Sequence, residues 1–185
     1  MTSTVWYKAT GNNGKALYGH GSWNLPTDTE PGDWMEPITW RLVECENGYH
    51  FHDSSVVHTL FGTEFYLAEP AGEQIVKNGL CLARGGRLLQ KLNWNRAIAI
   101  QLADDVLAYM KRTYHEDIVS IGADAHHYYN HLKTATKIGW YYLLEEFMHY
   151  VFFPEYAFFP GRTWVSQDRL WMRQRLLMYL HGGIA

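Results

Sequence analysis

The sequence contains few cysteines and no long apolar run, and these two absences exclude several classes of protein. Cys45 and Cys81 are its only cysteines, too few for the disulfide framework of a small secreted domain. The apolar stretch YVFFPEYAFF is interrupted at Pro154 and Glu155 and is too short to cross a bilayer. The initial MTSTVWYKAT lacks the basic and apolar segments of a signal peptide. We therefore expect a soluble, cytoplasmic protein.

The sequence also has no large excess of positive or negative charge. The chain has 16 Lys and Arg residues against 19 Asp and Glu, with a formal net charge of -3, so nucleic acid and anionic membranes are not expected partners. Aromatic residues, in contrast, are abundant: they make up 16% of the chain, with 8 Trp and 13 Tyr. Because amphipathic rings are favoured at binding surfaces, this composition favours a protein that binds a partner or a second copy of itself.

The hydrophobic pattern changes its period near residue 93. Before that point, short alternating runs bounded by Gly, Pro and Asn predict strands. The expected strands include 4–10, 40–44, 48–52, 64–72 and 73–79, and 80–92 is expected to form a pair of strands or one long bent strand. After it, apolar residues recur at helical spacing and predict about four helices. The expected class is α+β, with a mainly antiparallel sheet in a β-rich half (1–93) and a helical half (94–185), forming one compact domain.

The stretch CENGYHFHDSSVVH at 45–58 gathers one cysteine and three histidines, which are preferred ligands of zinc. Cys45, His50 and His52 are close in sequence, but a closed zinc site needs a fourth ligand, and no C-x-x-C or H-x-x-x-H pair follows nearby. A fourth ligand from His58 would require the next segment to fold back over the strand. We predict a turn and a strand without bound metal. A zinc site and a ligand-binding role for His50 are the alternatives.

Two other polar groups are candidate sites. His127 and His131 are one helical turn apart and can present two ligands on one face. The HExxH pattern is absent, however, and a solvated, aromatic-rich helix face is the favoured interpretation. In ARGGRLL, Arg84 and Arg87 flank two glycines. Backbone N–H groups beside two guanidinium groups can hold a phosphate, which makes both arginines candidate ligand-binding residues. The alternative is a β-bulge or turn with exposed arginines.

The C-terminal GRTWVSQDRLWMRQRLLMYL combines arginine with tryptophan. The candidate partner-binding residues here are Trp164, Arg169, Trp171 and Arg173. Arginine beside tryptophan can grip an acidic partner or stack on a base. An amphipathic helix that extends its arginines over a core is the alternative.

Six segments spread over roughly residues 5–108 form a recognisable pattern: WYKAT, PGDWMEPI, CENGYHF, FYLAEPAGEQI, LARGGRLLQKLNWN and AIQLADDVL. In these segments the first half resembles a domain family associated with bacteriophages and actinobacteria. The resemblance implies a phage-associated protein, but the family brings no established activity. It therefore implies a cellular location, the cytoplasm of a host cell, but no enzymatic activity.

The strand order is also similar, at the level of fold, to ADP-ribosyltransferases. That similarity implies a nicotinamide pocket lined by Tyr7, Tyr49 and Phe51, with Glu73 as the catalytic carboxylate and NAD as the cofactor. Without it, no complete catalytic set is recognisable and no cofactor is expected. Our first hypothesis is a small accessory protein that binds a host protein or a nucleotide-like ligand. An NAD-dependent transferase is the alternative.

Overall fold

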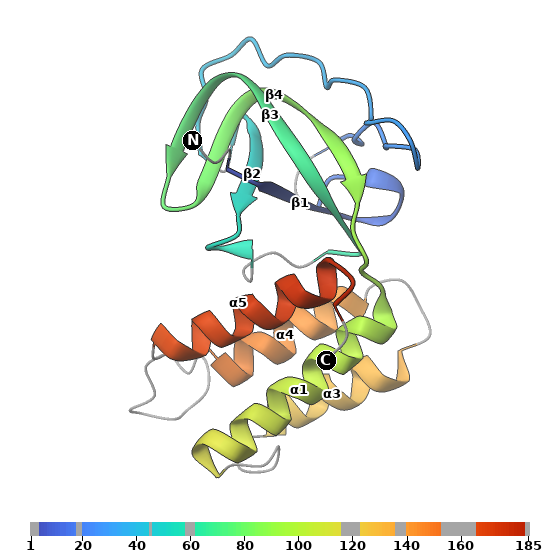
Figure 1. Ribbon diagram of the computed structural model, residues 1–185, viewed down its shortest axis with the longest axis vertical. Helices are drawn as coiled ribbons and strands as arrows, with labels where there is room; N and C mark the ends of the chain where they lie inside the picture. Colours follow the sequence, from blue (N-terminus) through green and yellow to red (C-terminus); the bar gives the residue numbers. More distant parts are fainter. Residues whose placement is uncertain are drawn as a thin grey trace. The chain divides into compact units, whose positions relative to one another are not determined.

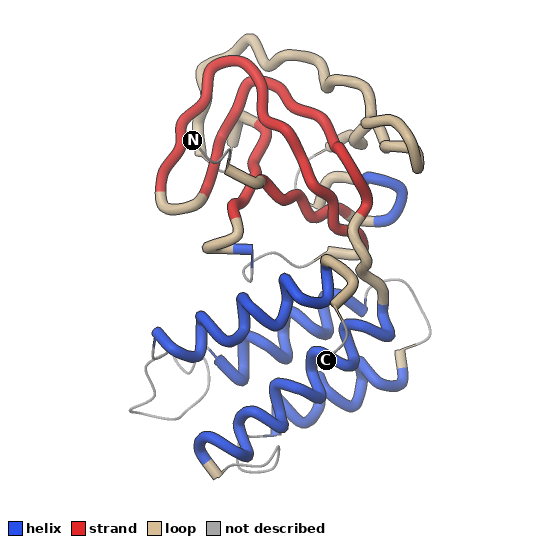
Figure 2. The backbone as a smooth tube through the Cα atoms, in the orientation of Figure 1, coloured by secondary structure: helices blue, strands red, loops and turns tan. Residues whose placement is uncertain are grey.

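The computed structural model describes residues 4–17, 20–44, 46–57, 62–115, 123–135, 140–152 and 166–183 (Figures 1 and 2). Its elements in chain order are β1 (Trp6–Thr10), the 3-10 turn η1 (Asn12–Gly14), β2 (Tyr49–Asp53), β3 (Glu64–Lys77), β4 (Leu80–Lys91), α1 (Arg96–Tyr114), α3 (Ala123–Thr134), α4 (Trp140–Phe152) and α5 (Ser166–Leu180). An antiparallel sheet followed by helices confirms the predicted α+β class. Two compact units are present: a barrel unit, 1–93 with 177–185, and a helical unit, 94–176.

The four strands close into an antiparallel barrel in the order β1-β2-β4-β3. The long β3–β4 hairpin dominates it (Figure 1). Asn78 and Gly79 connect these two strands with φ values of 51 and 80°, as a two-residue turn of a hairpin requires. Register shifts lie between Leu67 and Ala68 and between Ala71 and Gln74. These irregularities bend the hairpin, so that two strands supply half of a closed barrel.

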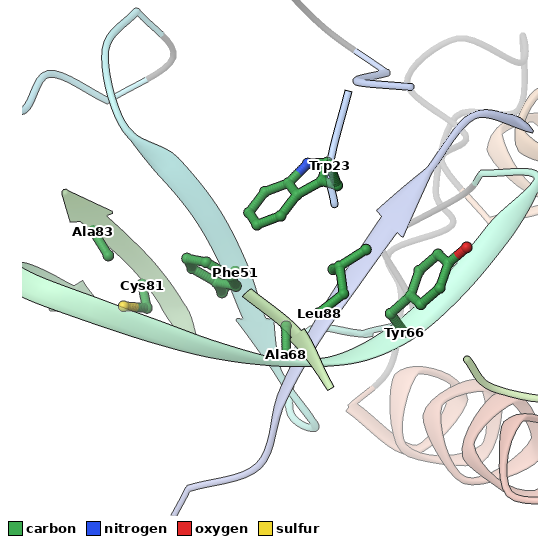
Figure 3. Close-up of a cluster of buried hydrophobic side chains, with 7 residues drawn as sticks. All are labelled: Trp23, Phe51, Tyr66, Ala68, Cys81, Ala83 and Leu88. Carbon is green, nitrogen blue, oxygen red and sulfur yellow. The ribbon is translucent and has the colours of Figure 1, made fainter. Parts of the chain in front are cut away.

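Alternate side chains of the strands point into the barrel. The buried cluster consists of Trp23, Phe51, Tyr66, Ala68, Cys81, Ala83 and Leu88 (Figure 3). Tyr49 packs against the same cluster, as expected for a residue two positions from Phe51. Gly86 lies so close to Phe51 that a Cβ atom there would collide with the ring. One glycine of the ARGGRLL segment is therefore explained by packing inside the barrel.

The segment from Asn24 to Trp40 contains no strand, yet its backbone is fixed to β4. The N–H groups of Gly32, Met35 and Ile38 donate to the carbonyl oxygens of Leu88, Gly86 and Arg84 over 2.9, 2.9 and 2.7 Å. Every third residue of the segment thus bonds to every second residue of the strand. This loop is held along its length, unlike a connection attached only at its ends.

The predicted helices are present in the helical unit, and Asn95 caps α1 by accepting a hydrogen bond from the N–H of Ile98 over 3.1 Å. The helices pack through a stripe of buried apolar residues. Its largest members are Leu102, Leu132, Leu144, Phe147, Met172 and Leu176. α5 ends before Gly182, which has a φ of 74°, and the N–H of Gly183 bonds back to the carbonyl of Met178 over 2.8 Å.

Candidate functional site

Two tryptophans of the 24–40 segment lie on the surface of the barrel unit. The side chain of Trp40 is 79% exposed and that of Trp34 is 47% exposed. A large apolar ring left this far in water is unusual, because its burial would be favourable by a few kcal/mol, about 1.5–3 for a large side chain. Together with Arg84 and Arg87 of β4, these rings form what we call the Trp34–Trp40 face.

The two arginines that the sequence singled out hold this face together. The Arg84 guanidinium bonds to the carbonyl oxygens of Ile38 and Trp40 over 2.8 and 2.7 Å. Its Nε also donates to Oε2 of Glu73 over 2.8 Å. Arg84 therefore fixes the backbone that carries the more exposed tryptophan.

Arg87 has the equivalent role at the other tryptophan. Its guanidinium carbon lies 4.3 Å from the ring centre of Trp34, in cation–π contact. Its Nε donates to Oε2 of Glu69 over 2.8 Å. Each arginine is thus paired with a carboxylate, so the Trp34–Trp40 face presents balanced charge instead of a positive patch. Two aromatic rings over a rigid and nearly neutral backing are suited to apolar and cation–π contacts.

The interior of the barrel holds a second group, built on Lys8. Its Nζ lies 5.2 Å from the ring centre of Trp23 and donates to the carbonyl of His50 over 2.9 Å. Burial lowers the pKa of Lys8 to about 8. The ring of Trp23 also meets Tyr49 and Phe51 edge-on, at centroid distances of 5.1 and 5.7 Å. This arrangement holds a cation of the protein itself among aromatic rings.

Tyr7 and the two histidines of β2 lie on the outer side of the barrel wall. Tyr7 is paired with His52 across β1 and β2, and such partners share a face. The Tyr7 hydroxyl lies 3.0 Å from Nε2 of His181. Burial raises the pKa of Tyr7. Burial, and next the charge of Lys8, lower the pKa of His52 to about 4. Nδ1 of His52 is buried and has no hydrogen-bond partner among the described residues.

The residues expected to form a nicotinamide pocket are therefore distributed over both sides of the sheet. Tyr49 and Phe51 pack against the interior cluster, whereas Tyr7 lies on the outer face with His52. Glu73 lies near the exposed end of β3 and is paired with Arg84. His50, also expected to bind a ligand, alternates with the interior residues and lies on the outer face; burial is the largest cause of its lowered pKa. Arg84 and Arg87 each form a salt bridge to a carboxylate of β3, whereas Tyr7 lies on the opposite face of the sheet from Tyr49 and Phe51.

The four candidates of the C-terminal segment have different surroundings. Trp164 and the side chain of Arg169 lie outside the described residues. Trp171 stacks on Tyr109 of α1, with a centroid distance of 4.3 Å and an interplanar angle of 19°. Arg173 is half-buried, and its Nε has no hydrogen-bond partner in the described part of the chain. Trp171 thus contributes to helix packing.

The histidine groups do not assemble into a metal centre within the part of the chain that the structure describes. In that part, no three His, Cys, Asp or Glu side chains are placed to hold an ion. Cys45 and His58 are not among the described residues, so the fate of the complete 45–58 set is untested. His127 and His131 do lie together on α3, with ring centroids 4.3 Å apart. Cys81 is buried inside the barrel, which raises the pKa of its thiol to about 11.

Sequence reasoning missed Trp34, Trp40 and Lys8. A tryptophan in PGDWMEP, amid turn-forming residues, is a signal for a surface ring because loops run over the surface. For Lys8, the only signal was alternation with Trp6 in a strand.

None of the described helices is long and apolar enough to span a membrane. In comparisons with known proteins, no family model, no curated protein and no solved structure matches this chain.

Proposed function

We propose that this protein is a phage-associated accessory protein that binds a host protein through the Trp34–Trp40 face. The observation that carries the proposal is the 79% exposure of Trp40 on a backbone that Arg84 holds in place. Tryptophan and arginine are the residues most enriched among those that dominate binding energy at protein interfaces. Here the two residue types are adjacent.

The fixed backbone supports a binding role as well. The carbonyls of Ile38 and Trp40 accept from Arg84, and the N–H groups of the segment donate to β4. Because the loop is already ordered, little conformational entropy remains to be lost when a partner docks. Rigid aromatic rings presented in this way gain affinity from preorganisation.

The balance of charge favours a protein over a nucleotide-like ligand. Arg84 and Arg87 are each in a salt bridge, with Glu73 and Glu69, at N–O distances of 2.8 Å. A phosphate would have to displace a carboxylate from each guanidinium. An apolar protein surface needs no such exchange, and a cationic side chain on the partner can stack on the exposed indole of Trp40.

The test compares Trp40→Ala with Tyr142→Ala, a change at a residue that is 52% exposed on α4. The partner is first identified by cross-linking in the native host and then purified, and its affinity for each variant is measured directly. We expect Trp40→Ala to weaken binding by about tenfold or more, as for a tryptophan at the centre of an interface. Trp34→Ala is expected to have a smaller effect, because Trp34 is less exposed.

Three outcomes would contradict the proposal. Equal affinity of the wild type and Trp40→Ala would exclude the face. Equal losses in Trp40→Ala and Tyr142→Ala would point to a nonspecific effect. A nucleotide that stabilises the wild type against heating, but not an Arg84→Gln variant, would favour the ligand hypothesis over the protein partner.

A further inference from the structure

The second half of β3 has an unpaired edge among the described residues. β1 pairs with β3 only from Glu64 to Ala68, whereas β4 continues to pair with it as far as Lys77. All residues from Gly72 to Lys77 are exposed. Unpaired backbone N–H and C=O groups on an exposed strand are a template for pairing with another strand.

The geometry of the hairpin decides which backbone groups face the open edge. Lys77 and Leu80 flank the two-residue turn, so their N–H and C=O groups bond to each other. By alternation, those of Ile75 also point to β4. The N–H and C=O groups of Gln74 and Val76 therefore point to the open edge and are available to a new strand.

The side chains along this edge are complementary to themselves. Glu73, Ile75 and Lys77 share one face of β3. In an antiparallel pair of identical strands centred on Ile75, Ile75 meets its own copy and Glu73 meets the second copy's Lys77, twice by symmetry. Gln74 and Val76 then become the hydrogen-bonded partners, in agreement with the directions of their backbone groups.

The contacts within one chain leave these charges available. Arg84 uses only Oε2 of Glu73, through both Nε and Nη2, so Oε1 can accept from a second cation. Ile75 is 49% exposed and Val76 is 58% exposed, so both faces of the edge offer apolar area. No described backbone group outside the hairpin bonds to Gln74 or Val76.

We propose that the Glu73–Lys77 edge of β3 pairs antiparallel with the same edge of a second copy of this chain, in the register centred on Ile75. The short edge makes this a concentration-dependent dimer of the weak class, not a permanent one. The proposal does not rest on the binding of a partner by the Trp34–Trp40 face.

Disulfide trapping tests the register. Ile75→Cys, in a Cys45→Ser background, places two cysteines opposite each other in a non-hydrogen-bonded pair, where Cβ atoms are closest. The native Cys81 is buried and its raised thiol pKa of about 11 keeps it protonated. We expect Ile75→Cys to cross-link at least about tenfold faster than Val76→Cys, whose side chain lies on the other face and meets Gln74. Equal rates, or a faster Val76→Cys, would overturn the register.

Sedimentation analysis over about a hundredfold range of concentration tests the dimer itself. Val76→Pro removes an N–H that faces only the open edge, so the hairpin is retained while each dimer loses hydrogen bonds at two symmetric positions. We expect dimerisation to weaken by about tenfold or more.

Lys77→Glu places like charges opposite each other and should have a similar effect on dimerisation. Lys15→Glu makes the same change in net charge at an exposed site outside β3 and should have none. A wild type that stays monomeric, or equal effects of the two glutamate variants, would overturn the proposal.

Discussion

In the helical unit, the buried carboxylate of Asp168 accepts hydrogen bonds from Tyr109 over 2.5 Å and from Tyr114 over 2.8 and 2.7 Å. In the barrel unit, the partly buried bases Lys8 and His52 have fewer partners. Lys8 is supported by one carbonyl and one indole ring, and Nδ1 of His52 has no partner among the described residues. A buried carboxylate that accepts from two hydroxyl donors contributes to stability, while a base with few hydrogen-bond partners has its pKa lowered by burial. The difference predicts that the helical unit depends on Asp168 and that the barrel unit depends on pH.

The largest expected effect comes from removing the satisfied carboxylate. Asp168→Ala removes the buried carboxylate that accepts from the hydroxyls of Tyr109 and Tyr114, and we expect it to lower the free energy of unfolding of the helical unit by about 3 kcal/mol. Hydrogen exchange measured separately in the two units reports where the loss occurs. The barrel should be affected less.

The control for Asp168→Ala is Asp124→Ala, at an exposed position in the first turn of α3. It should lower the unfolding free energy by less than about 1 kcal/mol, the contribution of an exposed acid at a helix start. If Asp168→Ala had an equally small effect, the carboxylate–tyrosine group would be unimportant for stability. The helical unit would then not depend on Asp168.

The next largest expected effect is a loss of stability of the barrel unit as the pH is lowered. The pKa of His52 in the folded protein is about 4, below the value of about 6.5 in an unfolded chain. Between these values the unfolded state binds more protons, so stability falls as the pH is lowered from 6.5 to 4. We expect His52 to account for a loss of about 2 kcal/mol between about pH 7 and pH 4.5.

The measurement is the difference in unfolding free energy between these two pH values, for the wild type and for His52→Gln. Between the two pH values, His52→Gln should lose about 2 kcal/mol less unfolding free energy than the wild type. His20→Gln, at an exposed histidine, should lose as much unfolding free energy as the wild type over the same pH range. Identical pH profiles for the wild type and His52→Gln would show that another group causes the acid sensitivity.

The elements were largely predictable because their periods are local properties of the sequence. Helical spacing predicted α1, and alternation predicted β1 and β2. The strand predicted at 40–44 was wrong, since Val43 makes only an isolated bridge to Asn47. Asn47 bonds through its side chain to the carbonyl of Arg41 over 2.7 Å, so a side-chain contact competes with the ladder.

The β3–β4 hairpin differs from the predicted division into strands. The sequence predicted separate strands at 64–72 and 73–79, the first ending at Gly72. The structure continues β3 through this point, with Gly72 at a φ of 74° and a register shift between Ala71 and Gln74. A glycine can either end a strand or form a bulge, and only the partner strand decides between the two.

The candidate site was predictable only in part, because it joins segments far apart in the chain. Arg84 and Arg87 were recognised as a pair from their spacing. Trp34 and Trp40 are about fifty positions away, and their segment is held to β4 by the backbone N–H groups of Gly32, Met35 and Ile38. Such bonds do not depend on side-chain identity and leave little trace in the sequence.

The smallest expected effect lies in the alkaline range and again separates the two units. The pKa of Lys8 in the folded protein is about 8, whereas that of an unfolded lysine is about 10.4. Between these values the unfolded state binds more protons, so raising the pH stabilises the barrel. Burial raises the pKa of Tyr7, Tyr49 and Tyr66, which opposes this trend only where tyrosines ionise, above about pH 10.

We therefore expect the barrel to gain about 1–2 kcal/mol of unfolding free energy between about pH 7.5 and pH 9.5. Lys8→Met keeps a long apolar side chain beside Trp23 and should abolish this gain. Lys15→Met, at an exposed lysine, should retain it. Equal gains in Lys8→Met and the wild type would mean that Lys8 stays charged in the folded barrel over this range. The contact with the Trp23 ring and the bond to the His50 carbonyl would then be sufficient to hold an ammonium ion there, and the contrast with Asp168 would disappear.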